Sequence, residues 1–208
     1  MIKTGLKELN NLIDGYKDEL NLIYGVPGSG KTTLCKLATI DLLKQKKKVV
    51  YIDTENGFSL DRFKQLAGQD FINFLDFLII IKVNNFEDQC KKIEELKELK
   101  KVSLVVVDSI GKFFRVEVKD NPKEINKELA NTLNTLRNIS KSNIPIIITS
   151  QVYNNINKNS IVPVGGEMIK KFCKRIIELR DKPRRIMQTK PDNKEMLFEI
   201  IEEGIKLL

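Results

Sequence analysis

The sequence of 208 residues lacks histidine and tryptophan altogether and contains only three cysteines. Without histidine, no imidazole can act as a general base, and a common ligand of zinc sites is missing. Cys35, Cys90 and Cys173 lie far apart and form no CxxC pair. We therefore expect reduced, buried thiols in a cytosolic protein, and neither a disulfide framework nor a zinc site.

The sequence also lacks long apolar segments. No hydrophobic run approaches the ~18 residues that a membrane-spanning helix needs, and the N-terminal segment MIKTGLKELNN has no signal-peptide core. These absences predict a soluble, cytoplasmic protein with no membrane partner. Because 208 residues suffice for one well-buried core, we expect a single domain over residues 1–208.

Acidic residues are fewer than basic residues. Lysine and arginine number 36 against 28 aspartates and glutamates, which gives a net charge of +8 and a pI near 9.3. Such an excess suits a polyanionic partner such as nucleic acid. A lysine-rich proteome would produce the same excess without such a partner, so charge alone leaves both interpretations open.

Short apolar runs rich in valine and isoleucine alternate with amphipathic stretches. Helical spacing predicts helices at 86–101 and 122–142, the second with Asn121 as its cap and Pro122 at its start. Buried strands alternating with helices indicate an α/β fold, with a mainly parallel central sheet and helices on both faces. The apolar runs predict strands at 20–25, 49–54, 77–81, 103–109 and 145–151.

After residue 165 the pattern changes. Three strand-like segments, 174–180, 184–190 and 197–205, are joined by tight turns and predict antiparallel strands at the C-terminal edge of the sheet. Segments 111–121 and 152–166 are predicted to be long loops.

The stretch GVPGSGKTT follows the first predicted strand and precedes a helical segment. It fits G-x-x-x-x-G-K-[ST], a loop whose backbone N–H groups and following helix bind phosphates. In this motif Lys31 reaches the β- and γ-phosphates, and the Thr32 hydroxyl binds Mg²⁺. The sequence therefore predicts a nucleotide site made by Gly25, Val26, Pro27, Gly28, Ser29, Gly30, Lys31, Thr32 and Thr33.

Three further polar residues end predicted strands. Asp108, after LVVV, is expected to hold Mg²⁺ through water, although a strand-end aspartate can also be a simple cap. Glu55, in YIDTEN, could orient or deprotonate a water that attacks the γ-phosphate, or could be a solvated loop carboxylate. Gln151, after IIITS, could sense the γ-phosphate or could contact only water.

Seven motifs follow one another along the chain, namely TGLKELNNLI, IYGVPGSGKTT, YIDTENGFSLDRF, LVVVDSI, ITSQV, PVGGEMI and FEIIEEGI. In this order they resemble the ATPase core of the RecA/RadA recombinases, and within them the short archaeal RadB family made of that core alone. The resemblance runs over almost the whole chain. It implies an ATP- and Mg²⁺-binding RecA-like P-loop core, with catalytic roles for Lys31 and Glu55. It also implies that Arg62 stacks on adenine and that Gln151 opens the second of two DNA-facing loops.

Departures from the recombinases limit the activity that the resemblance implies. An N-terminal helical DNA-binding domain is not expected, and neither is the upstream segment that links protomers. Thr33 replaces a glutamine, and QTKP at 188–191 replaces the Asp-Ser-Pro that caps a neighbour's ATP. The resemblance therefore implies a poor filament former with very weak ATPase and no strand exchange.

The two DNA-facing loops contain basic and aromatic residues, the combination that single-strand binders use. Lys112, Phe113 and Arg115 are candidates in the first loop, and Tyr153 and Lys158 in the second. The alternative is that Phe113 or its neighbour Phe114 anchors its loop to the core.

The leading hypothesis is an accessory protein of homologous recombination and DNA repair. Its expected partners are single-stranded or branched DNA, a RadA-like main recombinase and a junction resolvase. The alternative is a nucleotide-dependent signalling switch of the same superfamily that acts on protein partners. A small-molecule kinase is disfavoured because no arginine-rich lid follows the third strand.

Overall fold

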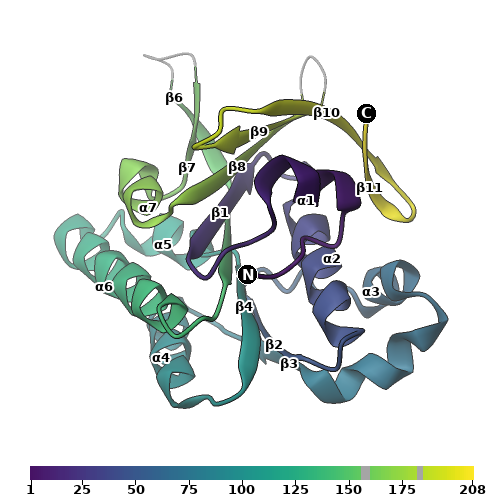
Figure 1. Cartoon of the computed structure of the whole chain (residues 1–208). Helices are drawn as coiled ribbons and strands as arrows, with labels where there is room; N and C mark the ends of the chain where they lie inside the picture. The colour runs from purple at the N-terminus through teal and green to yellow at the C-terminus, as the bar shows by residue number, and fades with distance from the viewer. Residues whose placement is uncertain (156–159, 182–184) are drawn as a thin grey trace.

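A nine-stranded sheet forms the centre of the computed structural model, which describes residues 1–155, 160–181 and 185–208 (Figure 1). The strand order is β11-β10-β9-β8-β1-β5-β4-β2-β3. The central strands are parallel, as the continuous apolar runs predicted, and their carboxyl ends meet at one edge. They are β8 (Arg175–Arg180), β1 (Leu20–Gly25), β5 (Ile146–Ser150), β4 (Val102–Asp108), β2 (Lys48–Asp53) and β3 (Leu78–Lys82).

The C-terminal strands β9 (Ile186–Lys190), β10 (Glu195–Ile201) and β11 (Gly204–Leu207) extend this sheet in antiparallel fashion, as predicted. Two details were wrong. The first of the three segments, β8, is not antiparallel on both sides. It pairs in parallel with β1 on one side and antiparallel with β9 on the other. The segment predicted as one strand at 197–205 is a hairpin, because the chain reverses before Gly204, whose φ of +130° suits a residue without Cβ.

Helices cover both faces of the sheet (Figure 1). One face carries α1 (Lys7–Ile13), α2 (Lys31–Leu43) and α3 (Leu60–Ala67); the other carries α4 (Phe86–Glu95), α5 (Lys112–Glu117), α6 (Pro122–Ser140) and α7 (Gly166–Phe172). Short 3-10 helices span Gln69–Phe77 and Leu96–Glu98. None of the helices in the described part of the chain has the length and hydrophobicity that crossing a bilayer requires.

Two apolar clusters form the core, one on each face of the sheet. In β2, Val49 and Tyr51 belong to the first cluster and Val50 and Ile52 to the second. This alternation follows from the two-residue repeat of a strand whose faces are both covered. All four side chains are therefore buried, and the strand reads as a continuous apolar run.

The long helix α6 begins where the sequence predicted. The Asn121 side chain accepts a hydrogen bond from Glu124 N at 3.4 Å, and Pro122 takes the first helical position.

The segments predicted as long loops contain regular structure. Residues 111–121 include helix α5, because Phe114 is buried against Phe86 with ring centroids 6.2 Å apart and so anchors a helical turn. Residues 152–166 include a hairpin of β6 (Val152–Asn155) and β7 (Ser160–Pro163).

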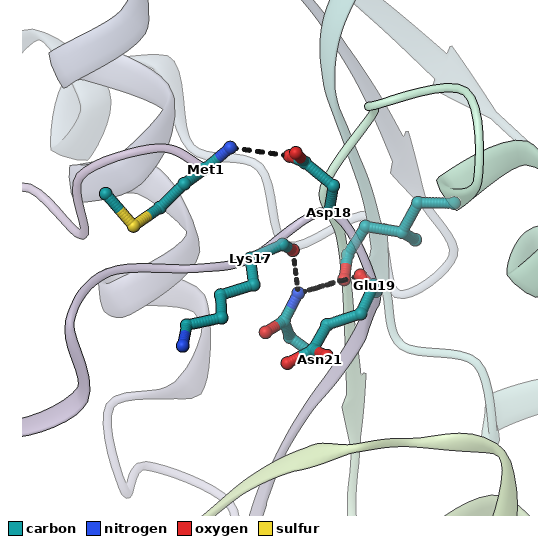
Figure 2. A network of polar contacts seen from close by, with 6 residues as sticks. Met1, Lys17, Asp18, Glu19 and Asn21 are labelled. Carbon is teal, nitrogen blue, oxygen red and sulfur yellow. Dashed lines mark hydrogen bonds and ion pairs between the residues drawn. The ribbon is translucent and has the colours of Figure 1, made fainter.

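The start of β1 is tied to its surroundings by one buried amide (Figure 2). The Asn21 side chain donates to Lys17 O, Glu19 O and Ile146 O at 2.9 to 3.2 Å, and so joins β1 to β5. Beside it, the Met1 amino group donates to Asp18 at 2.7 Å. The bonds of the Asn21 amide satisfy backbone carbonyls at the amino end of the strand that leads into the glycine-rich loop.

The three cysteines are free. Cys35 and Cys173 are buried, as expected, whereas Cys90 is half-buried.

Candidate functional site

The glycine-rich loop joins β1 to α2 at the carboxyl edge of the sheet. Gly30 caps α2 with φ of +102°, and a Cβ on Gly25 would lie 2.4 Å from Leu179 O, so both positions favour glycine. Gly28 has φ of +75° and open space where a Cβ would point. No side chain of the described residues caps the first turn of α2, so its N–H groups are free to bind an anion.

Lys31 lies in the first turn of α2 and is only 8% exposed. Its Nζ donates to Gly25 O and Val26 O, both at 2.9 Å. Burial lowers the pKa of Lys31, while the nearby carboxylates of Asp108 and Glu55 act in the opposite direction. A buried ammonium bonded to carbonyls and open to a pocket fits an anionic phosphate, which would offset the lost hydration.

Asp108 ends β4 and accepts hydrogen bonds from three hydroxyl groups. Thr32 Oγ1 and Tyr51 OH donate to Oδ2 at 2.7 Å, and Thr149 Oγ1 donates to Oδ1 at 2.5 Å. Burial and the charge of Asp108 raise the pKa of Tyr51, so the phenol stays protonated and acts as a donor. The carboxylate is thus held beside the Thr32 hydroxyl.

The pair of Thr32 and Asp108 supplies oxygen ligands of the kind that Mg²⁺ prefers. Within residues 1–155, 160–181 and 185–208, no three His, Cys, Asp or Glu side chains come together to hold a metal ion. Mg²⁺ at this site would therefore depend on further oxygens from phosphate and water, which is the usual arrangement at nucleotide sites.

Glu55 lies after β2 and takes part in a hydrogen-bond network that joins the segments following β2, β4 and β5 to helix α5. Ser109 Oγ donates to Glu55 at 2.7 Å, and Gln151 Nε2 donates to the two Glu55 oxygens at 3.0 and 3.2 Å. Arg115 Nη1 donates in turn to Gln151 Oε1 at 3.5 Å. These hydrogen bonds therefore connect Glu55 to helix α5 through Gln151, the residue that precedes the β6–β7 hairpin.

Arg62 lies in α3 and contacts the β10–β11 turn. Its guanidinium donates to Ile201 O at 2.9 Å and Glu202 O at 2.7 Å. These bonds hold the planar group at the β10–β11 turn, and Arg62 and Ile200 both line the same pocket.

One pocket of about 320 Å³ brings these groups together. Gly25, Val26 and Ser29 do not line it: the two carbonyls bind Lys31, and Ser29 is buried behind the loop. The sequence did not single out Tyr51, Thr149 or Ser109, which position Asp108 and Glu55. The lining consists of Pro27, Gly28, Gly30, Lys31, Thr32, Thr33, Glu55, Arg62, Asp108, Gln151 and Ile200.

The candidate DNA-facing residues lie on α5 and the β6–β7 hairpin. Arg115 is exposed and Tyr153 is half exposed, and both border a second, mainly apolar pocket of about 450 Å³. The Lys112 ammonium turns inward, donates to Thr54 O at 2.5 Å and lies 4.9 Å from the Phe113 ring centroid.

The Lys112 side chain is thus half-buried, and its ammonium group is directed at a backbone carbonyl. The half-buried Phe113 and the buried Phe114 both pack against the core, as the alternative interpretation of this segment expected. Lys158 lies outside the described residues.

Comparison with known proteins identifies the family. A family model described as Rad51 matches residues 1–207. The chain is 33% identical over 212 residues to the DNA repair and recombination protein RadB of Methanococcus maripaludis (strain C5), covering 96% of this chain and 97% of that protein. This chain belongs to the Rad51 family, in its RadB branch. The RadB of Methanococcoides burtonii is also 33% identical, over 214 residues, covering 96% and 95%.

The fold agrees with this assignment. The crystal structure of a RadB recombinase matches the RadB-family chain with a TM-score of 0.84 at 33% identity, over 99% of this chain and 98% of that one. The resemblance predicted from the order of the motifs is thereby confirmed, as is the α/β architecture. RecA-like proteins of this kind typically bind a nucleotide with Mg²⁺.

Proposed function

We propose that this RadB-family chain binds ATP, Mg²⁺ and DNA, hydrolyses ATP slowly, and acts as an accessory protein of recombination and DNA repair. The observation that carries the proposal is the single pocket lined by Lys31, Thr32, Glu55 and Asp108. The printed names of the RadB relatives support the biological role.

Phosphate binding follows from the loop and α2. Lys31 would exchange its two carbonyl partners for oxygens of the β- and γ-phosphates, and the free N–H groups of α2 would bind the same anion. Thr32 and Asp108 would hold Mg²⁺, the first directly and the second through water. Bound Mg²⁺ neutralises phosphate charge and polarises the γ-phosphate. Arg62 would stack on the adenine ring against the side chain of Ile200.

Glu55 is the proposed base. Its two oxygens accept from Ser109 and Gln151, which fixes the orientation of the carboxylate at the rim of the pocket. From there it would orient or deprotonate a water aimed at the γ-phosphate. Because Gln151 also contacts Arg115, its contact with the γ-phosphate would change with hydrolysis and affect α5.

DNA binding is assigned to α5 and the β6–β7 hairpin. Arg115 supplies charge for phosphate, and the exposed Tyr153 ring beside the apolar pocket suits the stacking of an unpaired base. Lys112 and Phe113 would contribute mainly by holding α5 in place. Single-stranded or branched DNA, which exposes unpaired bases, is the expected ligand.

The proposed weak turnover and lack of strand exchange would follow from the segment QTKP at 188–191. This segment offers no acidic cap for the ATP of a neighbouring copy, so a filament would form poorly and hydrolysis would be slow. The proposed protein partners are a RadA-like recombinase and a junction resolvase.

Two variants test the nucleotide half of the proposal. Lys31→Ala should abolish binding of a fluorescent ATP analogue, because the buried ammonium that contacts phosphate is gone. Glu55→Gln should bind the analogue within about twofold of wild type yet hydrolyse ATP about 10²-fold more slowly, since the amide cannot accept a proton. Glu8→Gln, an exposed change on α1, is the matched control and should leave both measurements unchanged. Wild-type turnover by Glu55→Gln would refute the assignment of the base.

One alternative function uses the same pocket. A nucleotide-dependent switch that acts on protein partners would need no DNA contact, and the inward-turned Lys112 ammonium favours it. A titration with single-stranded DNA separates the two functions, because such a switch has no salt-dependent affinity for DNA.

A further inference from the structure

A groove of about 860 Å³ runs between helices α4 and α6, which pack side by side on one face of the sheet (Figure 1). Glu117 of α5 borders it as well. It is larger than the nucleotide pocket and shares no residue with it. The groove is lined by Phe86, Glu87, Cys90, Lys91, Ile93, Glu94, Glu117, Glu124, Ile125, Glu128, Asn131, Thr132 and Thr135.

The charge of this groove is opposite to that of the molecule. Five glutamates and a single lysine line it, whereas the whole chain carries a net charge of +8. Such a surface repels nucleic acid and attracts a basic partner. The groove is thus separate in function from the DNA-facing residues of α5 and the hairpin.

The floor of the groove is apolar. Phe86 and Ile93 are at most 2% exposed, and the side chains of Cys90 and Ile125 are half-buried above them. Burial raises the pKa of Cys90 to about 11, so the thiol is uncharged, and it accepts a hydrogen bond from Thr132 Oγ1 at 3.2 Å. An occupant would therefore place an apolar side chain on the floor and cations at the rim.

Among the described residues, two of the glutamates at the rim form no ion pair and accept no hydrogen bond from a charged group. Glu117 accepts from Phe86 N at 3.0 Å, Glu94 pairs with Lys97, and Glu124 accepts from Asn121. Among the described residues, Glu87 forms neither a hydrogen bond through its side chain nor an ion pair, and the Glu128 carboxylate forms no ion pair and has only the Cys90 thiol as a hydrogen-bond partner. Glu124 and Glu128 are also four residues apart on α6, a spacing at which like charges repel. A bound cation would relieve this repulsion.

A metal ion is a poor occupant. In the described part of the chain no three acidic side chains converge on a metal site, and these five come from three helices. Lysine or arginine side chains spaced along a polypeptide match carboxylates that are spread along a groove.

We propose that the α4–α6 groove is the docking site for a basic segment of a partner protein, in which an apolar side chain is flanked by lysine or arginine. The proposal does not depend on the nucleotide pocket, since the two sites have separate linings.

The probe for this proposal is a short fluorescein-labelled peptide with a central leucine pair flanked by arginines. Its affinity is measured by fluorescence anisotropy. The double variant Glu87→Lys/Glu128→Lys should weaken binding by about tenfold or more, because two carboxylates that form no ion pair are replaced by charges that repel the arginines of the peptide. The matched control Glu8→Lys/Glu199→Lys reverses two exposed glutamates outside the groove and should change affinity by about twofold at most.

Alkylation of Cys90 gives an independent measurement. The bound peptide should slow its reaction with N-ethylmaleimide, whereas Cys35 and Cys173 are buried throughout. Unchanged far-UV circular dichroism and nucleotide affinity would show that Glu87→Lys/Glu128→Lys still folds.

Equal weakening by the control pair, equal affinity for a peptide with glutamates in place of arginines, or unslowed alkylation of Cys90 would each overturn the proposal. Sedimentation of the free protein tests whether a second copy of this chain occupies the groove instead. If Glu87→Lys/Glu128→Lys abolished self-association, the groove would hold a second copy of this chain, and the partner-segment proposal would be wrong.

Discussion

At the scale of single residues, the candidate site depends on side chains that position others. The carboxylate of Asp108 is held by donors from α2, β2 and β5, so its oxygens face Thr32 in a fixed orientation. The roles of Tyr51 and Thr149 as donors to Asp108 could not be predicted from the sequence, because a tyrosine or threonine inside a strand is common. The glycines, Lys31 and Asp108 were found because their spacing and position are rare outside phosphate sites.

Tyr51→Phe tests this positioning. The change keeps the aromatic ring, which meets Phe58 edge-on at 4.8 Å, and removes only the hydroxyl that donates to Asp108. We expect a loss of about 1.5–3 kcal/mol in the free energy of unfolding, typical for a hydrogen bond to a charged group. A weaker Mg²⁺ dependence of nucleotide binding should accompany it. Tyr153→Phe, at a half-exposed tyrosine, is the control. Equal stability of the two variants in denaturant titrations would contradict the role of Tyr51.

The lowered pKa of Lys31 predicts how stability depends on pH. Between the folded-state pKa and the ordinary value of 10.5, the unfolded chain binds more protons at this residue than the folded chain does. The free energy of unfolding therefore rises with pH in that window, because the cost of burying a charged lysine fades. We expect the stability of nucleotide-free wild type, relative to Lys31→Met, to increase as pH is raised from neutral toward 10.5. A flat or falling difference in denaturant titrations would show that Lys31 is not desolvated.

At the scale of elements, the sequence predicted well wherever burial on both faces makes a strand apolar throughout. Strands β1, β2, β4 and β5 follow that rule, and the prediction of each was close to its observed bounds. Short elements that depend on one contact were missed. Helix α5 relies on Phe114, and β11 is separated from β10 by a tight turn, so neither extends long enough to show a period.

Gln151→Ala tests whether the nucleotide pocket communicates with α5. The variant removes the amide that joins Glu55 to Arg115 but leaves both end groups in place. We expect single-stranded DNA to bind without nucleotide as in wild type, while any change of DNA affinity upon addition of ATP disappears. Ser109→Ala removes the other hydrogen bond to Glu55 and is the control. If the effect of ATP on DNA affinity persisted in Gln151→Ala and vanished in Ser109→Ala, the coupling would run through β4.

At the scale of the whole molecule, the positive charge is unevenly distributed. The α4–α6 groove is acidic, so the excess of lysine and arginine in the rest of the chain is larger than the net charge suggests. Composition revealed the excess but not this separation, because the glutamates of α4, α5 and α6 come together only in the fold. A DNA strand is therefore expected to avoid this groove and to bind where Arg115 and Tyr153 are exposed.

Salt dependence tests that arrangement. The affinity for fluorescein-labelled single-stranded DNA should fall linearly with salt on a double-logarithmic plot. Arg115→Ala should reduce the slope by about one, because one phosphate contact is lost. Lys112→Ala should change it less, since this ammonium already donates to Thr54 O. Lys91→Ala, in the α4–α6 groove, is the control and should leave the slope unchanged. Absence of salt-dependent binding below ~10 μM would remove DNA from the proposed function and leave the switch that acts on protein partners.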